Sequence, residues 1–396
     1  MKIKVGVIFG GETVEHEVSI ISAIQAINNM DRNKYDIIPI YIGKDRIWYT
    51  GRMLEDINIY KDMDLLKRYA KKVTLCKKDN TYFLVNTKGL FRKDVAELDV
   101  AFPIVHGINV EDGTLQGYLD TIGIPYVGSR VLGAALGQDK VVMKQVFAAE
   151  DIPVVPYTWF YDTEYYTSKE EIEKKVKRLG YPVIIKPANL GSSVGISIAR
   201  TEDELEKSIE EAIEYDTKIV VEKVIENMTE VNCSVLGNYQ SQQTGVLEEV
   251  MGADEFLSYQ DKYLGGGKTK GSKGMASTNR VIPARISDDL TKEIKETSKK
   301  VFRALNLSGV CRIDYIIDKK NNKFYVNEPN TIPGSLSFYL WEPAGKPYNE
   351  LLDDMINIAI KDFKNRSSKT YSFETNILSN CNGLKGSKGM KGKLRG

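Results

Sequence analysis

Short apolar runs alternate with segments of helical periodicity in the first third of the chain, and this alternation limits the fold more than any other feature. The opening run KVGVIFGG is β-branched and ends in two glycines, and the apolar residues after it recur at helical spacing: Val18, Ile21, Ile24 and Ile27. The later runs YDIIPIYI and DVAFPIVHG have the character of further strands. Strands that alternate with helices predict a parallel α/β sheet in this region.

A second module is predicted from about Ile152. Ser168 and Glu171 form a capping-box pattern at the start of a helix, and Gly180 is expected to end it. The apolar run YPVIIKP predicts a buried strand, and apolar residues at helical spacing predict a further helix from Asp203.

The run KIVVEKVI is expected to begin a third module, in which a helix (290–305) precedes two strands, VCRIDYIID and KFYVNE. Residues 260–280 are rich in glycine and poor in apolar side chains, so we expect a mobile, functional loop. The predicted domains are residues 1–125, 126–220 and 221–370, followed by a basic Gly/Lys-rich tail, 371–396, expected to be disordered.

Composition excludes several classes of protein. The 396 residues carry 55 basic and 54 acidic side chains, so the overall charge gives no reason to expect nucleic acid or a membrane surface as a partner. No apolar run has the length of a membrane span or a signal-peptide core, which predicts a cytoplasmic protein. Four widely spaced cysteines indicate core thiols, and two histidines leave carboxylates as the ligands for any hard cation.

The two strands of the third module carry polar residues on one face. Side chains two apart on a strand point the same way, so Arg312 and Asp314 share a direction, as do Glu328 and Asn330. A two-residue turn would place Asp314 opposite Pro329, whereas an odd-numbered loop centred on Asn321 pairs Asp314 with Glu328, and we predict the odd loop. Facing carboxylates suit Mg²⁺ bound to nucleotide phosphates; a solvated hairpin that ends at Pro329 is an equally weighted alternative on these residues alone.

Two other clusters favour a nucleotide. Lys186 precedes the loop GSSVG, whose glycines would let backbone amides approach phosphate oxygens, although a plain Gly-Ser hairpin has the same pattern. The strand that ends at Glu222 is followed by Glu230, where adenine and ribose could be bound, although an exposed charged strand end is the commoner explanation of such a pattern.

The ordered motifs GGETVEHEVS, VHGINVEDGTLQG, VGSRVLGAALGQDK, IIKPANLGSSVG, VVEKVIE, QDKYL, GVCRIDY and NEPNTIPGS resemble those of the D-alanine–D-alanine ligase family of ATP-grasp enzymes over residues 3–360. The resemblance implies an α/β fold of three modules with a Rossmann-like N-terminal domain. It also implies an ATP-dependent carboxylate–amine ligase that joins D-alanine to D-alanine for peptidoglycan synthesis, in a cytoplasmic homodimer.

The resemblance further implies roles for individual residues. Nucleotide contacts fall on Lys140, Lys186, Glu222, the backbone near Val224, Glu230 and Lys262. Two Mg²⁺ ions, or Mn²⁺ in their place, would be held by Asp314, Glu328 and Asn330. Catalysis falls on Glu17 for the donor ammonium group, Arg312 and Gly334 for the oxyanion, and the linked pair Ser192 and Tyr263, with His106 near the donor carboxylate.

The acceptor region departs from the family pattern. Where the family presents a small polar pair to the carboxylate of the second substrate, this chain has Tyr339-Leu340. Either the Tyr339 ring fills the subsite, or it turns outward and leaves Ser335 or Ser337 to bind the carboxylate; we predict the second arrangement. Other acceptors, such as D-lactate, D-serine or another amino acid, and a non-catalytic ATP-grasp binding protein are the alternative functions.

Overall fold

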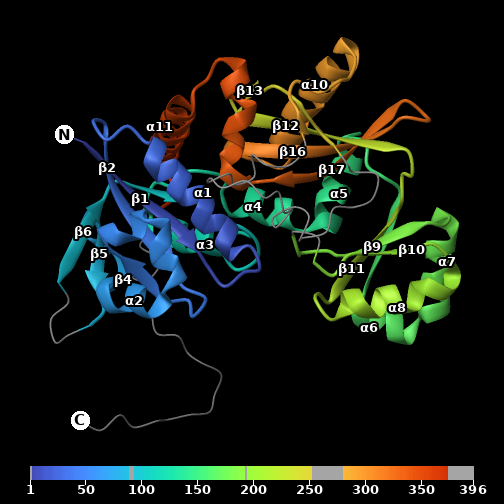
Figure 1. Ribbon diagram of the computed structural model, residues 1–396, viewed down its shortest axis with the longest axis horizontal. Helices are drawn as coiled ribbons and strands as arrows, with labels where there is room; N and C mark the ends of the chain where they lie inside the picture. The colour runs from blue at the N-terminus through green and yellow to red at the C-terminus, as the bar shows by residue number, and fades with distance from the viewer. Residues whose placement is uncertain (1, 89–92, 192–193, 252–279, 373–396) are drawn as a thin grey trace, which may run out of the picture.

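The computed structural model describes residues 2–88, 93–191, 194–251 and 280–372, which form three modules, each built on one β-sheet (Figure 1). The first sheet has seven strands in the order β6-β5-β4-β3-β2-β1-β7. Its strands are β1 (Ile3–Gly10), β2 (Tyr35–Ile42), β3 (Trp48–Thr50), β4 (Lys71–Lys78), β5 (Thr81–Asn86), β6 (Asp94–Leu98) and β7 (Val100–Pro103). The helices of this region are α1 (His16–Asn29), η1 (Arg52–Glu55), η2 (Ile57–Lys61), α2 (Met63–Tyr69) and α3 (Thr114–Ile122).

The prediction of a parallel first sheet is only partly right. Strand β1 pairs in parallel with β2 and β7, but β2 through β6 pair antiparallel. The reason is the connections: a two-residue turn at Asp79-Asn80 joins β4 to β5, and a turn this short can connect only antiparallel neighbours. The predicted strand–turn–helix at the start is confirmed, because β1 ends at Gly10 and α1 follows.

The second sheet has four antiparallel strands in the order β10-β9-β11-β8. Helices α4 (Val131–Gln138) and α5 (Lys140–Ala149) lead into it from the first module. The elements that follow are β8 (Tyr157–Tyr161), α6 (Asp162–Thr167), α7 (Lys169–Leu179), β9 (Val183–Pro187), β10 (Ser197–Ala199), α8 (Glu202–Ile213) and β11 (Lys218–Lys223). Gly180 ends α7 with a positive φ of 78°, as predicted.

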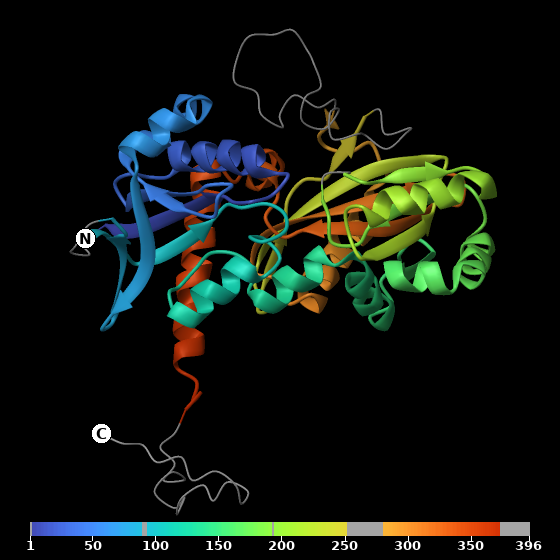
Figure 2. The same cartoon turned by 90° about the horizontal axis from the view of Figure 1, so that it is seen from below.

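Two predicted domain boundaries do not match this arrangement. The boundary at 220/221 cuts β11, which belongs to the second sheet and pairs with β8 and β9, so the third module begins after Lys223. The last helix, α11 (Tyr348–Ser367), buries Leu351, Leu352 and Ile356 in the same hydrophobic core as the first sheet. Figure 2 shows this helix running alongside the first module.

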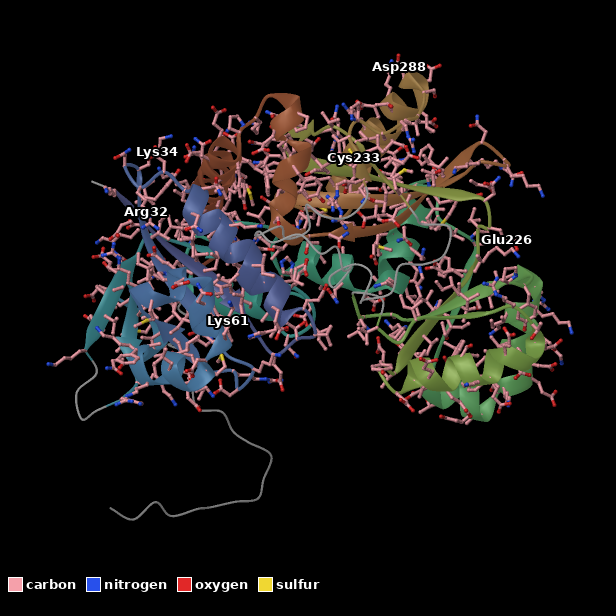
Figure 3. The ribbon with its side chains drawn as sticks, in the orientation of Figure 1. Arg32, Lys34, Lys61, Glu226, Cys233 and Asp288 are labelled. Carbon is pink, nitrogen blue, oxygen red and sulfur yellow. The ribbon has the colours of Figure 1, made fainter. Side chains whose placement is uncertain are left out.

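The third sheet has the order β15-β14-β12-β16-β17, with β13 paired to β12. Its elements are β12 (Met228–Gly237), β13 (Gln242–Thr244), β14 (Glu248–Val250), β15 (Arg280–Val281), α10 (Asp288–Ala304), β16 (Gly309–Asp318), β17 (Lys323–Asn330), η4 (Gly334–Leu340) and η5 (Glu342–Ala344). Cys233 and Cys311 are fully buried in its core, as predicted, whereas Cys76 is half-buried. Figure 3 places Cys233 inside this module and Glu226 at the periphery, after β11. No helix of the described residues is both long and apolar enough to cross a membrane.

Candidate active site

A cavity lies where the three modules meet. The first module contributes Glu15, His106 and Glu111 to its lining, the start of α5 contributes Lys140, and the loop after β9 contributes Gly191. The third sheet and the segment after it contribute Glu230, Asn232, Glu248, Arg280, Arg312, Asp314, Glu328, Asn330 and Gly334. Eight of the nineteen residues predicted from the sequence therefore line one cavity, although they come from segments as far apart as His106 and Gly334.

The β16–β17 hairpin has the predicted pairing. Asp314 lies opposite Glu328, and Arg312 lies opposite Asn330. The predicted loop is wrong, because the turn between Asp318 and Lys323 has four residues, and the odd residue is instead Asn327, which forms a β-bulge between Val326 and Glu328. The bulge brings Glu328 to the cavity face, which the predicted odd loop would also have done.

Cations hold the two carboxylates of the hairpin. Arg312 donates to both oxygens of Asp314 over 2.7 Å each, and Asn330 Nδ2 donates to the same carboxylate over 3.0 Å. Lys140 Nζ lies 3.3 Å from a Glu328 oxygen. Burial alone would lower the pKa of Arg312, but the Asp314 carboxylate keeps it well above its ordinary value, so the guanidinium stays charged.

The hairpin residues fit a hard cation bound together with a substrate. Asp314, Glu328 and Asn330 present oxygen donors on one cavity face, as Mg²⁺ requires. Within the described residues no group of three or more His, Cys, Asp or Glu side chains could hold a metal alone. Phosphate or water oxygens would have to complete the shell, which is the usual situation for Mg²⁺ at nucleotide sites.

A buried ionic cluster lies beside the hairpin in the second module. Glu222 accepts from Lys186 Nζ at 3.0 Å, and Lys144 Nζ lies 3.1 Å from its other oxygen. Burial favours the neutral carboxyl, but the two ammonium groups lower the pKa of Glu222 to about 2. Lys144 was missed from the sequence, although its position one helical turn after Lys140 on α5 was a signal. Lys186 also reaches Oδ1 of the bulge residue Asn327, at 3.4 Å.

Of the residues predicted to bind adenine and ribose, Val224 already uses its backbone amide within the protein, whereas Glu230 faces the cavity. The N–H of Val224 donates to the Pro182 carbonyl over 3.1 Å, so this amide is engaged within the protein. Glu230, predicted to bind ribose, lines the cavity two residues before Asn232 on β12.

The first module presents a different glutamate from the predicted one. The structure places Glu17 on the surface, where its carboxylate lies 2.9 Å from Lys44 and both side chains are 62% exposed. Glu15 lines the cavity instead. Glu17 lies in the first turn of α1, whereas Glu15 precedes the helix and its side chain approaches Gly191 of the second module.

Glu111 and His106 line the cavity on the side of the first module. Glu111 accepts hydrogen bonds of 2.9 Å from Gly107 N, Thr331 Oγ1 and Ile332 N, which ties the first module to the segment after β17. Burial, and then the neighbouring Glu15, raise the pKa of Glu111 to about 7. Burial lowers the pKa of His106 to about 4, so its imidazole is neutral at physiological pH. Glu111 lies in the motif VHGINVEDGTLQG but was not selected from the sequence.

The acceptor region differs from the predicted arrangement. The Tyr339 ring does not turn outward: its hydroxyl donates to Glu248 over 3.2 Å, and the Arg280 guanidinium lies 4.3 Å from the ring centroid. Ser335 and Ser337 are buried and are not among the described residues that line the cavity. The Leu340 carbonyl accepts from Val246 N, which fixes the segment against the third sheet. Gly334, at the start of η4, does line the cavity.

Comparison with known proteins shows the family of the chain. Two family models match, one described as the D-ala D-ala ligase N-terminus over residues 4–129 and one as the D-ala D-ala ligase C-terminus over residues 146–357. A D-alanine–D-alanine ligase of Thermosipho melanesiensis is 40% identical over 378 residues, which is 95% of this chain and 98% of the relative. The chain belongs to the D-alanine–D-alanine ligase family.

Solved structures of ligases share the fold. The D-alanine–D-alanine ligase from Coxiella burnetii superposes with a TM-score of 0.77 at 29% identity, covering 92% of this chain and 96% of that one. The VanG D-Ala:D-Ser ligase from Enterococcus faecalis superposes with a TM-score of 0.74 at 30% identity, covering 91% of this chain and 100% of that one. The predicted ATP-grasp architecture is thereby confirmed.

Some ligase-family positions named from the sequence lie outside the described residues. They are Ser192, Lys262 and Tyr263, together with most of the loop predicted at 260–280 and most of the predicted tail. The described part of the site consists of the β16–β17 hairpin, the start of α5 at Lys140, the carboxylates of the first module and the β14–β15 edge.

Proposed function

We propose that this member of the ligase family joins two molecules of D-alanine in an ATP-dependent reaction, through an acyl phosphate, for peptidoglycan precursor synthesis. The observation that carries the proposal is the pairing of Asp314 with Glu328 in a cavity that also holds Arg312, Lys140 and Glu15. Such a cavity offers partners for phosphates, for a developing oxyanion and for an ammonium group. The full-length similarity to D-alanine–D-alanine ligases supports the same substrate.

In the first step the donor carboxylate attacks the γ-phosphorus of ATP, and ADP leaves. We assign Lys140 and Lys186 to the phosphates, since their ammonium groups contact the adjacent residues Glu328 and Asn327 of β17, next to the proposed metal ligands. Asp314, Glu328 and Asn330 would hold two Mg²⁺ ions, which neutralise phosphate charge when bound. Glu15, in place of Glu17, is assigned to the ammonium group of the donor because it is the glutamate of this pair that faces the cavity.

In the second step the amine of the acceptor attacks the acyl carbon, and phosphate leaves from a tetrahedral oxyanion. Arg312 and the Gly334 amide are assigned to that oxyanion. Arg312 is already oriented by its two bonds to Asp314, so little reorganisation is needed as charge develops. This preorganisation is the main catalytic contribution that we ascribe to the described residues.

The proposal is tested by incubating the protein with ATP, Mg²⁺ and D-alanine alone and measuring phosphate release and dipeptide mass. Matched reactions contain L-alanine, or D-alanine together with D-serine or D-lactate. Dipeptide formation from D-alanine alone supports the proposal, whereas phosphate release and product only with a second acceptor would assign the chain to another acceptor class.

The cellular location and the oligomeric state are two further proposals. We place the enzyme in the cytoplasm because the reaction consumes ATP and the precursor is made before export. The homodimer implied by the family resemblance is a proposal that sedimentation of the purified chain would test, with a monomer as the contrary result.

A further inference from the structure

The edge of the third sheet opposite the hairpin carries a second polar cluster on the cavity face. Glu248 on β14 lies opposite Asn232, Asn232 lies opposite Asp314, and Asp314 lies opposite Glu328. Directly opposed residues on neighbouring strands point to the same face of a sheet, so these four side chains form one row across four strands. All four line the cavity.

Glu248 is the centre of this cluster. It is 1% exposed, and its carboxylate accepts from Asn232 Nδ2 at 3.0 Å and from the Tyr339 hydroxyl at 3.2 Å. Arg280 Nη1 lies 2.9 Å from its other oxygen. The Arg280 guanidinium also stacks over the Tyr339 ring, with 4.3 Å between its central carbon and the ring centroid. Arg280 is thus fixed in position by a buried carboxylate and an aromatic face.

We infer that Arg280, held by Glu248 and Tyr339, binds the carboxylate of the second substrate. Three cationic side chains of the described residues line the cavity. Lys140 lies at Glu328 and Arg312 is bound through two nitrogens to Asp314, which places both at the hairpin end. Arg280 is the cation at the opposite end of the row.

The chemistry of a guanidinium suits this role. It has five N–H donors in one plane, so it can hold Glu248 and a second carboxylate at the same time, and it remains charged at every physiological pH. The cluster also accounts for the tyrosine at a position where the family presents a small polar residue. The Tyr339 hydroxyl is directed to Glu248, so the ring supports the arginine and the arginine, in place of a hydroxyl, meets the substrate.

The inference rests on the proposed ligase function and is tested by separating the two substrate sites. Initial rates are measured for wild type, Arg280→Lys and Arg280→Met over a wide range of D-alanine concentration at saturating ATP, and the donor and acceptor KM are fitted separately. We expect Arg280→Met to raise the acceptor KM about 10- to 100-fold, as the loss of a charge-assisted bond implies, with the donor and ATP KM changed less than about threefold. Arg280→Lys should recover part of the loss, because it keeps the charge without the planar donors.

A second readout uses D-alaninamide, an acceptor amine that lacks the carboxylate. Wild type should prefer D-alanine as acceptor, and Arg280→Met should lose most of that preference because the amide never used the arginine. An equal rise in the KM for ATP, or an unchanged preference for D-alanine over D-alaninamide in a folded variant, would overturn the inference.

Control variants separate binding from folding. Arg285 pairs with Glu249, the next residue of β14, with Nε 2.9 Å from the carboxylate, and is 59% exposed on the other face of the same edge. Arg285→Met should leave the acceptor KM unchanged. The double variant Arg280→Met/Glu248→Gln removes both charges, so it avoids an unpaired buried carboxylate and should still show the raised acceptor KM. If wild type uses an acceptor other than D-alanine, the proposed substrate is wrong, but the same comparison with that acceptor and its amide still tests Arg280.

Discussion

The residues at the two ends of the polar row on the third sheet were predicted from the sequence with very different success. At the hairpin end, the metal-ligand candidates are two residues apart on paired strands, and the structure confirms their pairing. At the β14–β15 end, Glu248 and Arg280 were not selected, and the predicted position of the Tyr339 ring was wrong. The hairpin end depends on local strand geometry, whereas the other end depends on contacts between segments about 30 to 90 positions apart.

The difference also has a chemical side. In the proposed function, charges at the hairpin end bind phosphates and ions, which every enzyme of this reaction class handles, so common residue types recur there in recognisable order. The opposite end is proposed to bind the acceptor, and there the Arg280 guanidinium lies over the Tyr339 ring. Variants at each end of the row can therefore test whether the hairpin end binds phosphates and ions and whether the β14–β15 end binds the acceptor.

The largest effect is expected at the hairpin. Glu328→Gln removes one charge from the proposed Mg²⁺ shell without a change in volume, so turnover should fall on the order of 10³-fold, equivalent to about 4 kcal/mol. Steady-state phosphate release measures it, with an unchanged thermal midpoint as the control for folding. A folded variant with near-normal turnover would show that the hairpin end does not hold the metal.

The next test concerns His106, which is buried beside the segment that connects β17 to η4. Its imidazole lies next to the backbone of Ile332, a residue of that segment. Because its pKa is lowered to about 4 in the folded chain, only the unfolded chain binds its proton between pH 6.5 and pH 4. Neutral His106 therefore favours folding above pH 6.5, and this contribution is lost as the pH falls.

At pH 5 this loss should be about 2 kcal/mol, since pH 5 lies about 1.5 units below the ordinary histidine pKa of 6.5 and each unit corresponds to about 1.4 kcal/mol. Urea unfolding at pH 7.5 and pH 5 compares wild type with His106→Gln, which lacks the titrating group. The difference between the two proteins should shift against wild type as the pH falls; parallel curves would mean that His106 is protonated when folded.

A matched pair of glutamates tests the donor side of the cavity. Glu15→Gln should raise the donor KM and lower kcat/KM about 30-fold, close to 2 kcal/mol, because the charge that meets the ammonium group is lost. Glu17→Gln should change both constants less than twofold, since its partner Lys44 is on the surface. The reverse outcome would restore the assignment made from the sequence.

The smallest effect is expected at the acceptor end. Tyr339→Phe keeps the ring beneath Arg280 and removes only the hydroxyl that donates to Glu248, which retains Asn232 and Arg280. The acceptor KM should rise about threefold, corresponding to less than 1 kcal/mol. A change confined to the KM of ATP would move the tyrosine to the nucleotide side.

The fold itself was predictable where periodicity is local. Alternating apolar runs identified β1, α1, β9 and the β16–β17 hairpin, since each carries its pattern within one segment. The antiparallel half of the first sheet was missed because its strands carry short patterns: β4 alternates only from Val73 to Cys76, between pairs of lysines. The packing of α11 onto the first sheet was missed because a helical pattern reveals that a face is buried but not what covers it.

The site shows the same limit residue by residue. The motif containing Glu15 and Glu17 was found, but its two glutamates cannot be distinguished until the start of α1 is known. Lys144 and Glu111 lay inside or beside recognised motifs and were passed over because burial, which gives both their importance, is not visible in the sequence.

The bulge at Asn327 has a consequence for how the chain can change in length. Removing this residue would leave Val326 opposite Tyr315 and Glu328 opposite Asp314, so the register of the metal-ligand candidates would survive the deletion. The contact from Asn327 to Lys186 would not survive, and with it one of the direct links between the second and third modules. The inserted residue therefore separates two properties that evolution could alter independently: the alignment of the ligands along the sheet, and the mechanical coupling of that sheet to its neighbour.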